Sequence, residues 1–172
     1  MSLLAEVVAV LDEHDVRYGL IGGVALAAHG VARATLDTDL LVVDLRVLNP
    51  GMWTNSLPNA ALDIRRGDSV DPLAGLIRIT SGAEIVDLVV GRGGWQERIL
   101  TRVRPIELGD GTFAVVDAGD LVLLKLYAGG PQDLLDIDLI LSNSDGAIRV
   151  RVEARIADAP QSARERWRAR VG

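Results

Sequence analysis

The segment spanning residues 18–44 constrains the fold of this chain more than any other part of the sequence. A short apolar run at 18–21 ends at the pair Gly22-Gly23, an alanine-rich stretch covers 24–29, and a second apolar run covers 38–44. Short apolar runs bounded by glycine predict buried strands, and an alanine- and leucine-rich stretch that ends at a glycine predicts a helix. We therefore expect a strand, a tight turn, a helix and a second buried strand in this order.

The rest of the chain alternates apolar strands with helices. An amphipathic stripe predicts a helix over residues 2–14, whereas residues 45–61, with two prolines, mix helix and loop. Further strands are expected at 61–65, 76–80, 83–90, 106–108 and 113–116, and further helices at 95–104, 117–128, 131–141 and, as two short helices, within 147–170. The predicted fold class is α/β (α+β): a mixed sheet flanked by helices, with a domain at 1–141 and a short helical C-terminal extension at 142–172.

The composition excludes several kinds of site. The 172 residues include no cysteine and only 2 histidines, which excludes disulfides, thiolate metal sites, cysteine nucleophiles and a histidine-rich metal site. No apolar run approaches the length of a membrane span, and the acidic N-terminus lacks the features of a signal peptide, so we expect a cytoplasmic protein without membrane contact. The net charge of -6 argues against a protein that coats nucleic acid non-specifically.

Asp37 and Asp39 stand at the start of an apolar strand. Residues i and i+2 of an extended chain point to the same face, so the two carboxylates lie side by side. A cation between them would relieve their repulsion, and hard oxygen ligands of this kind suit Mg²⁺. The alternative is that the two carboxylates are solvated at the end of the strand. Asp87 lies in the apolar run 83–90 and joins the pair if the two strands are neighbours, or else lies at an exposed edge. Three convergent acids are typical of two-metal phosphoryl or nucleotidyl transfer.

This pattern resembles that of the DNA polymerase β-like nucleotidyltransferase superfamily. The family pattern is a Gly-Gly or Gly-Ser pair, Asp-x-Asp after a short interval, and a distant third Asp on a strand, here Gly22-Gly23, Asp37, Asp39 and Asp87. The resemblance covers residues 15–141 and looks closest to small stand-alone bacterial members, including the AbiEii-like toxins of type IV toxin–antitoxin systems and related minimal nucleotidyltransferases. Many members have Gly-Ser at the first motif, where this chain has Gly23, so that phosphate contacts there would fall to backbone amides.

The resemblance implies a Mg²⁺-dependent enzyme that transfers NMP from an NTP to an acceptor. It implies that Asp37 and Asp39 hold two Mg²⁺ ions. Asp87 would complete the metal site and act as general base or orient the acceptor hydroxyl. Gly22 and Gly23 would cradle the phosphates.

Lys125 is the only lysine of the chain and lies in an apolar helix. By resemblance it contacts the nucleotide phosphates; the alternatives are snorkelling to the surface and a salt bridge to Asp133 or Asp136. Asp133 and Asp136 would orient Lys125 or the acceptor. Arg33 and Thr35, just before the first two acids, would contact phosphate or acceptor, or else are ordinary loop residues.

The acceptor is the part of the reaction with most alternatives. Residues 149–170 hold seven arginines against three acids, which fits an RNA-acceptor surface, a solvated amphipathic tail or a partner-binding helix. The resemblance implies a tRNA end or a protein as acceptor and a cognate antitoxin as partner. One alternative is an aminoglycoside nucleotidyltransferase, against which stands the lack of a second acid-lined helical domain. The other is a non-catalytic nucleotide- or partner-binding module. His29 is expected to be structural and Asp138 to lie at the surface.

Overall fold

The computed structural model describes residues 1–32 and 37–172. Seven strands form one mixed sheet in the order β3-β4-β5-β2-β1-β7-β6. The strands are β1 (Tyr18–Ile21), β2 (Asp37–Val42), β3 (Ala61–Arg66), β4 (Gly75–Ser81), β5 (Glu84–Val90), β6 (Arg104–Leu108) and β7 (Gly111–Val115). β2 lies at the centre, antiparallel to β1 and parallel to β5. The chain between β2 and β5 is a long crossover that contains β3 and β4.

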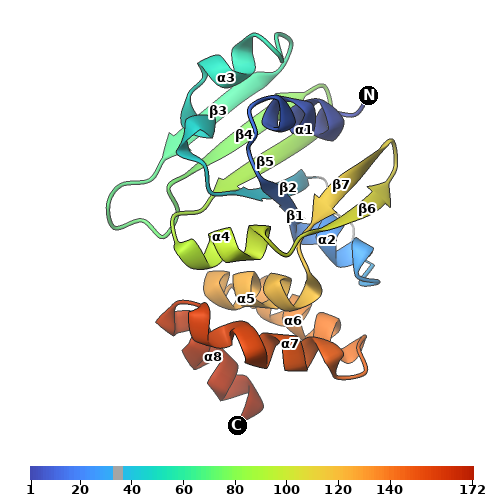
Figure 1. Cartoon of the computed structure of the whole chain (residues 1–172), viewed down its shortest axis with the longest axis vertical. Coiled ribbons are helices and arrows are strands. Elements are labelled where there is room, and N and C mark those ends of the chain that lie inside the picture. The colour runs from blue at the N-terminus through green and yellow to red at the C-terminus, as the bar shows by residue number, and fades with distance from the viewer. Residues whose placement is uncertain (33–36) are drawn as a thin grey trace.

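Eight helices surround the sheet or gather at one end of it. They are α1 (Leu3–Glu13), α2 (Gly22–Ala28), α3 (Gly51–Thr54), α4 (Gly94–Leu100), α5 (Ala118–Ala128), α6 (Pro131–Ser142), α7 (Ala147–Arg155) and α8 (Gln161–Val171), with the 3-10 turns η1 (Leu45–Leu48) and η2 (Ile156–Asp158), all within the described residues. Figure 1 shows the sheet with α1 in the upper half and α5 to α8 together at the opposite end, where the chain terminates. No helix of the described chain is long and apolar enough to cross a membrane.

The structure confirms the predicted fold class, with local differences in the bounds of elements. The helix expected over 95–104 ends at Leu100, because β6 already begins at Arg104. α2 begins at Gly22, earlier than the expected start, so the glycine pair forms its first turn. The expected boundary between residues 141 and 142 stays a prediction.

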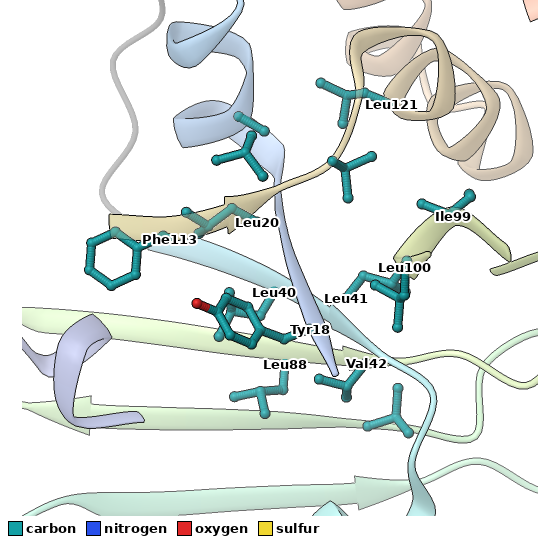
Figure 2. Packing of buried hydrophobic residues seen from close by; sticks show 14 of the residues in the cluster. Tyr18, Leu20, Leu40, Leu41, Val42, Leu88, Ile99, Leu100, Phe113 and Leu121 are labelled. Atoms are coloured by element: carbon teal, nitrogen blue, oxygen red, sulfur yellow. The ribbon is translucent and has the colours of Figure 1, made fainter. Parts of the chain in front are cut away.

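The central strand β2 is buried on both faces of the sheet. Successive residues of a strand point to opposite faces, yet Leu40, Leu41 and Val42 are all fully buried. Figure 2 shows these side chains among apolar residues of β1, β5, β7, α4 and α5, including Leu20 and Leu88. The rest of β2, from Asp37 to Asp39, is only partly buried, and the polar side chains of this strand lie there.

The arginine-rich C-terminal segment packs on the protein instead of extending into solvent. Trp167 of α8 is buried, and both α7 and α8 contact α5. Arg166 donates to the carbonyl oxygen of Leu126 at 2.7 Å, and Arg170 forms an ion pair with Asp138. Of the three alternatives for this segment, the solvated tail is wrong. Arg166 and Arg170 contact the protein itself, so they are less available to an RNA, and a partner-binding helix stays a prediction.

A buried ionic network joins α7 to the start of α5. Asp120 is fully buried and accepts hydrogen bonds from Arg102 at 2.7 and 2.8 Å and from Arg155 at 2.9 Å. Asp117 caps α5 through the Gly119 amide and also accepts from Arg155. Burial would raise the pKa of Asp117, but the hydrogen bonds from Arg155 and Gly119 and the charge of Arg151 lower it below its ordinary value. These acids therefore anchor the helical end of the molecule.

Replacing Asp120 with asparagine is expected to lower the free energy of unfolding by about 2 kcal/mol, because the variant leaves the partly buried Arg102 guanidinium without its carboxylate and removes one of the two carboxylates of Arg155. The matched control is Asp138→Asn, which removes an exposed carboxylate from its pair with Arg170 and should cost no more than about 0.5 kcal/mol. Urea denaturation of both variants checks the difference, and equal losses would contradict it.

Candidate active site

The three acids of the motif lie side by side on two neighbouring strands. Asp37 and Asp39 open β2, and the parallel pairing with β5 places Asp39 directly opposite Asp87. Register partners on adjacent strands point to the same face of the sheet, as do residues i and i+2 of one strand. The structure therefore brings the three carboxylates together, and Asp87 lies buried within the sheet instead of at an exposed edge.

Gly22 leaves the space that the Asp39 carboxylate occupies. Its backbone is in the left-handed region, with a φ of 63°, at the junction of β1 and α2. A Cβ atom on Gly22 would lie 2.0 Å from Oδ2 of Asp39, far closer than any non-bonded contact. Both the backbone conformation and the carboxylate therefore require glycine at this position. Gly23 follows as a buried residue in the first turn of α2.

Arg78 of β4 is a site residue that the sequence analysis missed. Its Nε donates to Oδ1 of Asp87 at 2.9 Å, its Nη2 donates to Oδ2 of the same carboxylate at 2.6 Å, and Nη2 also reaches Oδ2 of Asp37 at 3.2 Å. Hydrogen bonds from Arg78 to Asp87 raise the pKa of the guanidinium, which keeps its charge. A signal was present in the sequence: the hairpin that pairs Ser81 with Glu84 also pairs Arg78 with Asp87.

Asp39 has an unusual protonation equilibrium. Burial raises the pKa of Asp39 to about 6; the neighbouring Asp87 and Asp37 carboxylates also raise this pKa, and the charges of Lys125 and Arg78 oppose the rise. A carboxylate that is both desolvated and beside two others is destabilised in its charged form. A cation bound here would remove that cost.

The raised pKa of Asp39 predicts a pH-dependent stability in the absence of metal. Between pH 3.8 and about 6 the folded chain holds a proton that the unfolded chain has lost, so stability falls as pH rises through this window. Relative to Asp39→Asn, the wild type should lose on the order of 2 kcal/mol between pH 4 and pH 7. Urea denaturation with a chelator present checks this, and pH profiles that run parallel for the two proteins would contradict it.

Lys125 lies in a buried ion-pair cluster with the two acids of α6 named above. Its Nζ donates to Oδ2 of Asp136 at 2.6 Å and to Oδ1 of Asp133 at 3.3 Å, and Asp136 is fully buried. Of the alternatives for Lys125, the structure shows the salt bridge and excludes snorkelling, because the residue is only 7% exposed. The charge of Lys125 lowers the pKa of Asp39, so the ammonium acts electrostatically on this carboxylate of β2.

The other residues named in the sequence analysis lie in a structural contact, at the surface or outside the described residues. The Nε2 atom of His29 donates to the carbonyl oxygen of Val116 at 2.7 Å, a structural contact as predicted. Asp138 is exposed, as expected. Arg33 and Thr35 lie outside the described residues, so their contacts with phosphate or acceptor stay predictions.

The donor set suits a hard divalent cation. Within residues 1–32 and 37–172, no three Asp, Glu, His or Cys side chains are arranged as a metal site, and both oxygens of Asp87 accept hydrogen bonds from Arg78. The chemistry nevertheless fits: three carboxylates share one face, ionised Asp39 is destabilised, and Arg78 already stands in as the cation between Asp37 and Asp87. Asp37, Asp39 and Asp87 are therefore the residues that could hold Mg²⁺.

Solved structures similar to this chain include nucleotidyltransferases. The structure of ANT(2'')-Ia in complex with adenylyl-2''-tobramycin matches with a TM-score of 0.54 and 15% identity, over 90% of this chain and 95% of that one. The lincosamide antibiotic adenylyltransferase LnuA, lincomycin-bound, matches with a TM-score of 0.51 and 12% identity, over 82% of this chain and 96% of that one. An antigenic nucleotidyltransferase-like protein from Paracoccidioides brasiliensis matches with a TM-score of 0.51 and 15% identity, over 94% of this chain and 90% of that one.

The sequence itself matches no protein-family model, and no curated protein matches it. At these identities the similarity concerns the fold alone. The chain therefore has the fold of the nucleotidyltransferases.

Proposed function

We propose that this protein is a Mg²⁺-dependent nucleotidyltransferase that moves NMP from an NTP to a hydroxyl of an acceptor and releases diphosphate. The observation that carries the proposal is the register of β2 and β5, which sets Asp39 beside Asp87 with Asp37 on the same face. Two Mg²⁺ ions held there would neutralise the triphosphate and activate the attacking hydroxyl. A cytoplasmic setting, where NTP and Mg²⁺ are available, is part of the proposal.

In this proposal Asp37 and Asp39 would hold the Mg²⁺ ions, and Asp87 would complete the site and orient or deprotonate the acceptor hydroxyl. That hydroxyl attacks the α-phosphorus, the bond to the β-phosphate oxygen breaks, and diphosphate leaves. The fixed carboxylates matter because they are held by the sheet and need no reorganisation as charge shifts. Gly22 leaves the space that the Asp39 carboxylate occupies, and the backbone amides of Gly22 and Gly23 would contact the phosphates.

Lys125 would neutralise charge that develops on the triphosphate. Asp133 and Asp136 would hold its ammonium in place through the salt bridges that the structure contains. Arg33 and Thr35, which precede Asp37 in the chain, would contact the phosphates or the acceptor.

For the acceptor, the resemblance to AbiEii-like toxins supports a tRNA end or a protein, with a cognate antitoxin as partner. A small cationic molecule such as an aminoglycoside is the second candidate, and one observation favours it. The structural matches cover 95% of ANT(2'')-Ia, in complex with adenylyl-2''-tobramycin, and 96% of LnuA, lincomycin-bound, so a fold of this extent can accommodate a small acceptor. The acidic chain, with a net charge of -6, also suits a cationic acceptor.

A labelling experiment tests the reaction and identifies the acceptor class together. Purified protein, Mg²⁺ and each α-labelled NTP are incubated with RNA, protein or small-molecule fractions of a bacterial lysate and with a panel of aminoglycosides. Label on one fraction that is absent with Asp39→Ala supports transfer and names the acceptor. NTP binding without label on any acceptor would instead support a non-catalytic binding module of the same fold.

Expression in a bacterial host separates the two acceptor candidates. A toxin that modifies tRNA or protein arrests growth, and an antibiotic-modifying enzyme protects growth in the presence of the drug. Either phenotype should disappear with Asp39→Ala. A phenotype that persists in this variant would contradict an origin in nucleotidyl transfer.

A further inference from the structure

Both oxygens of the Asp87 carboxylate accept hydrogen bonds from a neighbouring cation of the protein itself, Arg78. Arg78 binds its two oxygens through two different nitrogens, at 2.9 and 2.6 Å, and extends a third contact of 3.2 Å to Asp37. The pair lies in register on adjacent antiparallel strands, so the backbone fixes the guanidinium next to the carboxylate. Bidentate pairs of this kind are among the strong charge-assisted hydrogen bonds.

A divalent cation and this guanidinium compete for the same oxygens. Mg²⁺ binds carboxylate oxygens at about 2.0–2.1 Å and demands near-octahedral geometry. Oxygens that accept hydrogen bonds from Arg78 direct electron density toward the guanidinium, and its positive charge repels a second cation nearby. Binding of a metal by Asp87 and Asp37 therefore requires Arg78 to withdraw.

The Arg78 side chain has room to move away from Asp87. Its side chain is 46% exposed, although the Asp87 side chain that it covers is only 9% exposed. On the opposite side, Arg78 is in register with Asp63 of β3, but that carboxylate already pairs with Arg65 at 2.9 Å. The guanidinium can thus move into solvent without disturbing the core.

We propose that Arg78 is a positioning residue that acts as an exchangeable counter-ion, holding Asp87 and Asp37 together without metal and releasing them when a divalent cation binds. This inference rests on the proposed function, because it takes these carboxylates as metal ligands. It deepens that function by coupling the third acid to metal binding: Asp87 becomes available to the acceptor only after the cation has displaced Arg78.

Metal titration of the nucleotide-free protein tests this proposal without an activity assay. Mg²⁺ and Mn²⁺ are titrated calorimetrically into the wild type, Arg78→Gln and Arg78→Lys at one ionic strength. Arg78→Gln should bind metal about tenfold more tightly than the wild type, because a competing charge-assisted pair is gone. Arg78→Lys keeps the charge but loses the planar fork, so it should bind more tightly than the wild type and less tightly than Arg78→Gln.

Arg65→Gln is the matched control for net charge. Arg65 lies on the adjacent strand β3 and pairs with Asp63 at 2.9 Å, away from Asp87. Its removal should leave the metal affinity within about twofold of the wild type, since exposed charges are well screened. Thermal melting checks that each variant is folded. If Arg78→Gln does not fold, Arg78→Lys alone carries the test.

The outcomes separate this inference from the proposed function. Metal affinity that is unchanged or weaker in both Arg78 variants, with clear binding by the wild type, overturns the counter-ion role and leaves the metal site standing. An equal gain in Arg65→Gln also overturns it, because the effect would then be one of net charge. No metal binding by the wild type or any variant overturns both proposals.

Discussion

Replacing Asp39 with asparagine is expected to abolish nucleotidyl transfer, with a loss in kcat/KM of at least about 10³-fold. Asp39 lies between the other two acids: it shares a strand with Asp37 and a register position with Asp87. Asparagine keeps the shape of the side chain but removes the charge that a divalent cation requires. Steady-state release of diphosphate at saturating Mg²⁺ measures the loss.

Loss of activity in Asp39→Asn must not come from unfolding, and the structure predicts that it will not. Burial and two neighbouring acids destabilise ionised Asp39, so the variant should be more stable than the wild type at pH 7 without metal. Asp63→Asn is the matched control, since it removes an exposed carboxylate from β3 and should keep full activity. Activity retained within tenfold in Asp39→Asn would refute the assignment of the metal site.

Gly22→Ala is expected to reduce kcat/KM by at least about 100-fold, because it displaces the Asp39 carboxylate from its place at the site. The added Cβ would lie 2.0 Å from Oδ2 of Asp39 and 2.9 Å from its Cγ, so either the carboxylate rotates away or β1 and α2 shift. The positive φ of 63° adds backbone strain of roughly 1 kcal/mol. Kinetic assays and thermal melting of the variant measure the two effects separately.

Gly82→Ala separates backbone strain from the steric clash. Gly82 has a φ of 57°, close to that of Gly22, but a Cβ there would meet nothing within 4 Å. Both variants should lose similar stability from the backbone, and only Gly22→Ala should lose activity. Full activity in Gly22→Ala would show that the contact with Asp39 does not matter for the reaction.

The elements of the sheet follow from local sequence, but their order does not. Strand β2 and strand β5 are each readable from apolar runs bounded by turn residues. Their pairing joins segments separated by two other strands, and local periodicity carries no information on such long-range contacts. From the sequence, Asp39 and Asp87 could be expected to meet only if their two strands were neighbours. The register of β2 and β5 shows that they are.

The ion pairs of the site and of the helical end also differ in whether local sequence can predict them. Arg78 could have been found from the hairpin register around Ser81, because a short turn fixes which residues face each other. The buried network around Asp120 could not, since its partner Arg155 lies on α7, distant in sequence, and the arginines of that segment looked free. Charged residues in apolar segments signal a partner, but the fold decides which one.

The most direct test of the central claim compares α- and γ-labelled NTP with the wild type, Asp39→Asn and a Mg²⁺ chelator. The account predicts that the α-phosphate label passes to the acceptor, that the γ-phosphate label leaves as diphosphate, and that both signals vanish with Asp39→Asn or with the chelator. Transfer of the γ-phosphate label to the acceptor, or transfer of the α-phosphate label that survives loss of Asp39, would contradict nucleotidyl transfer at this site.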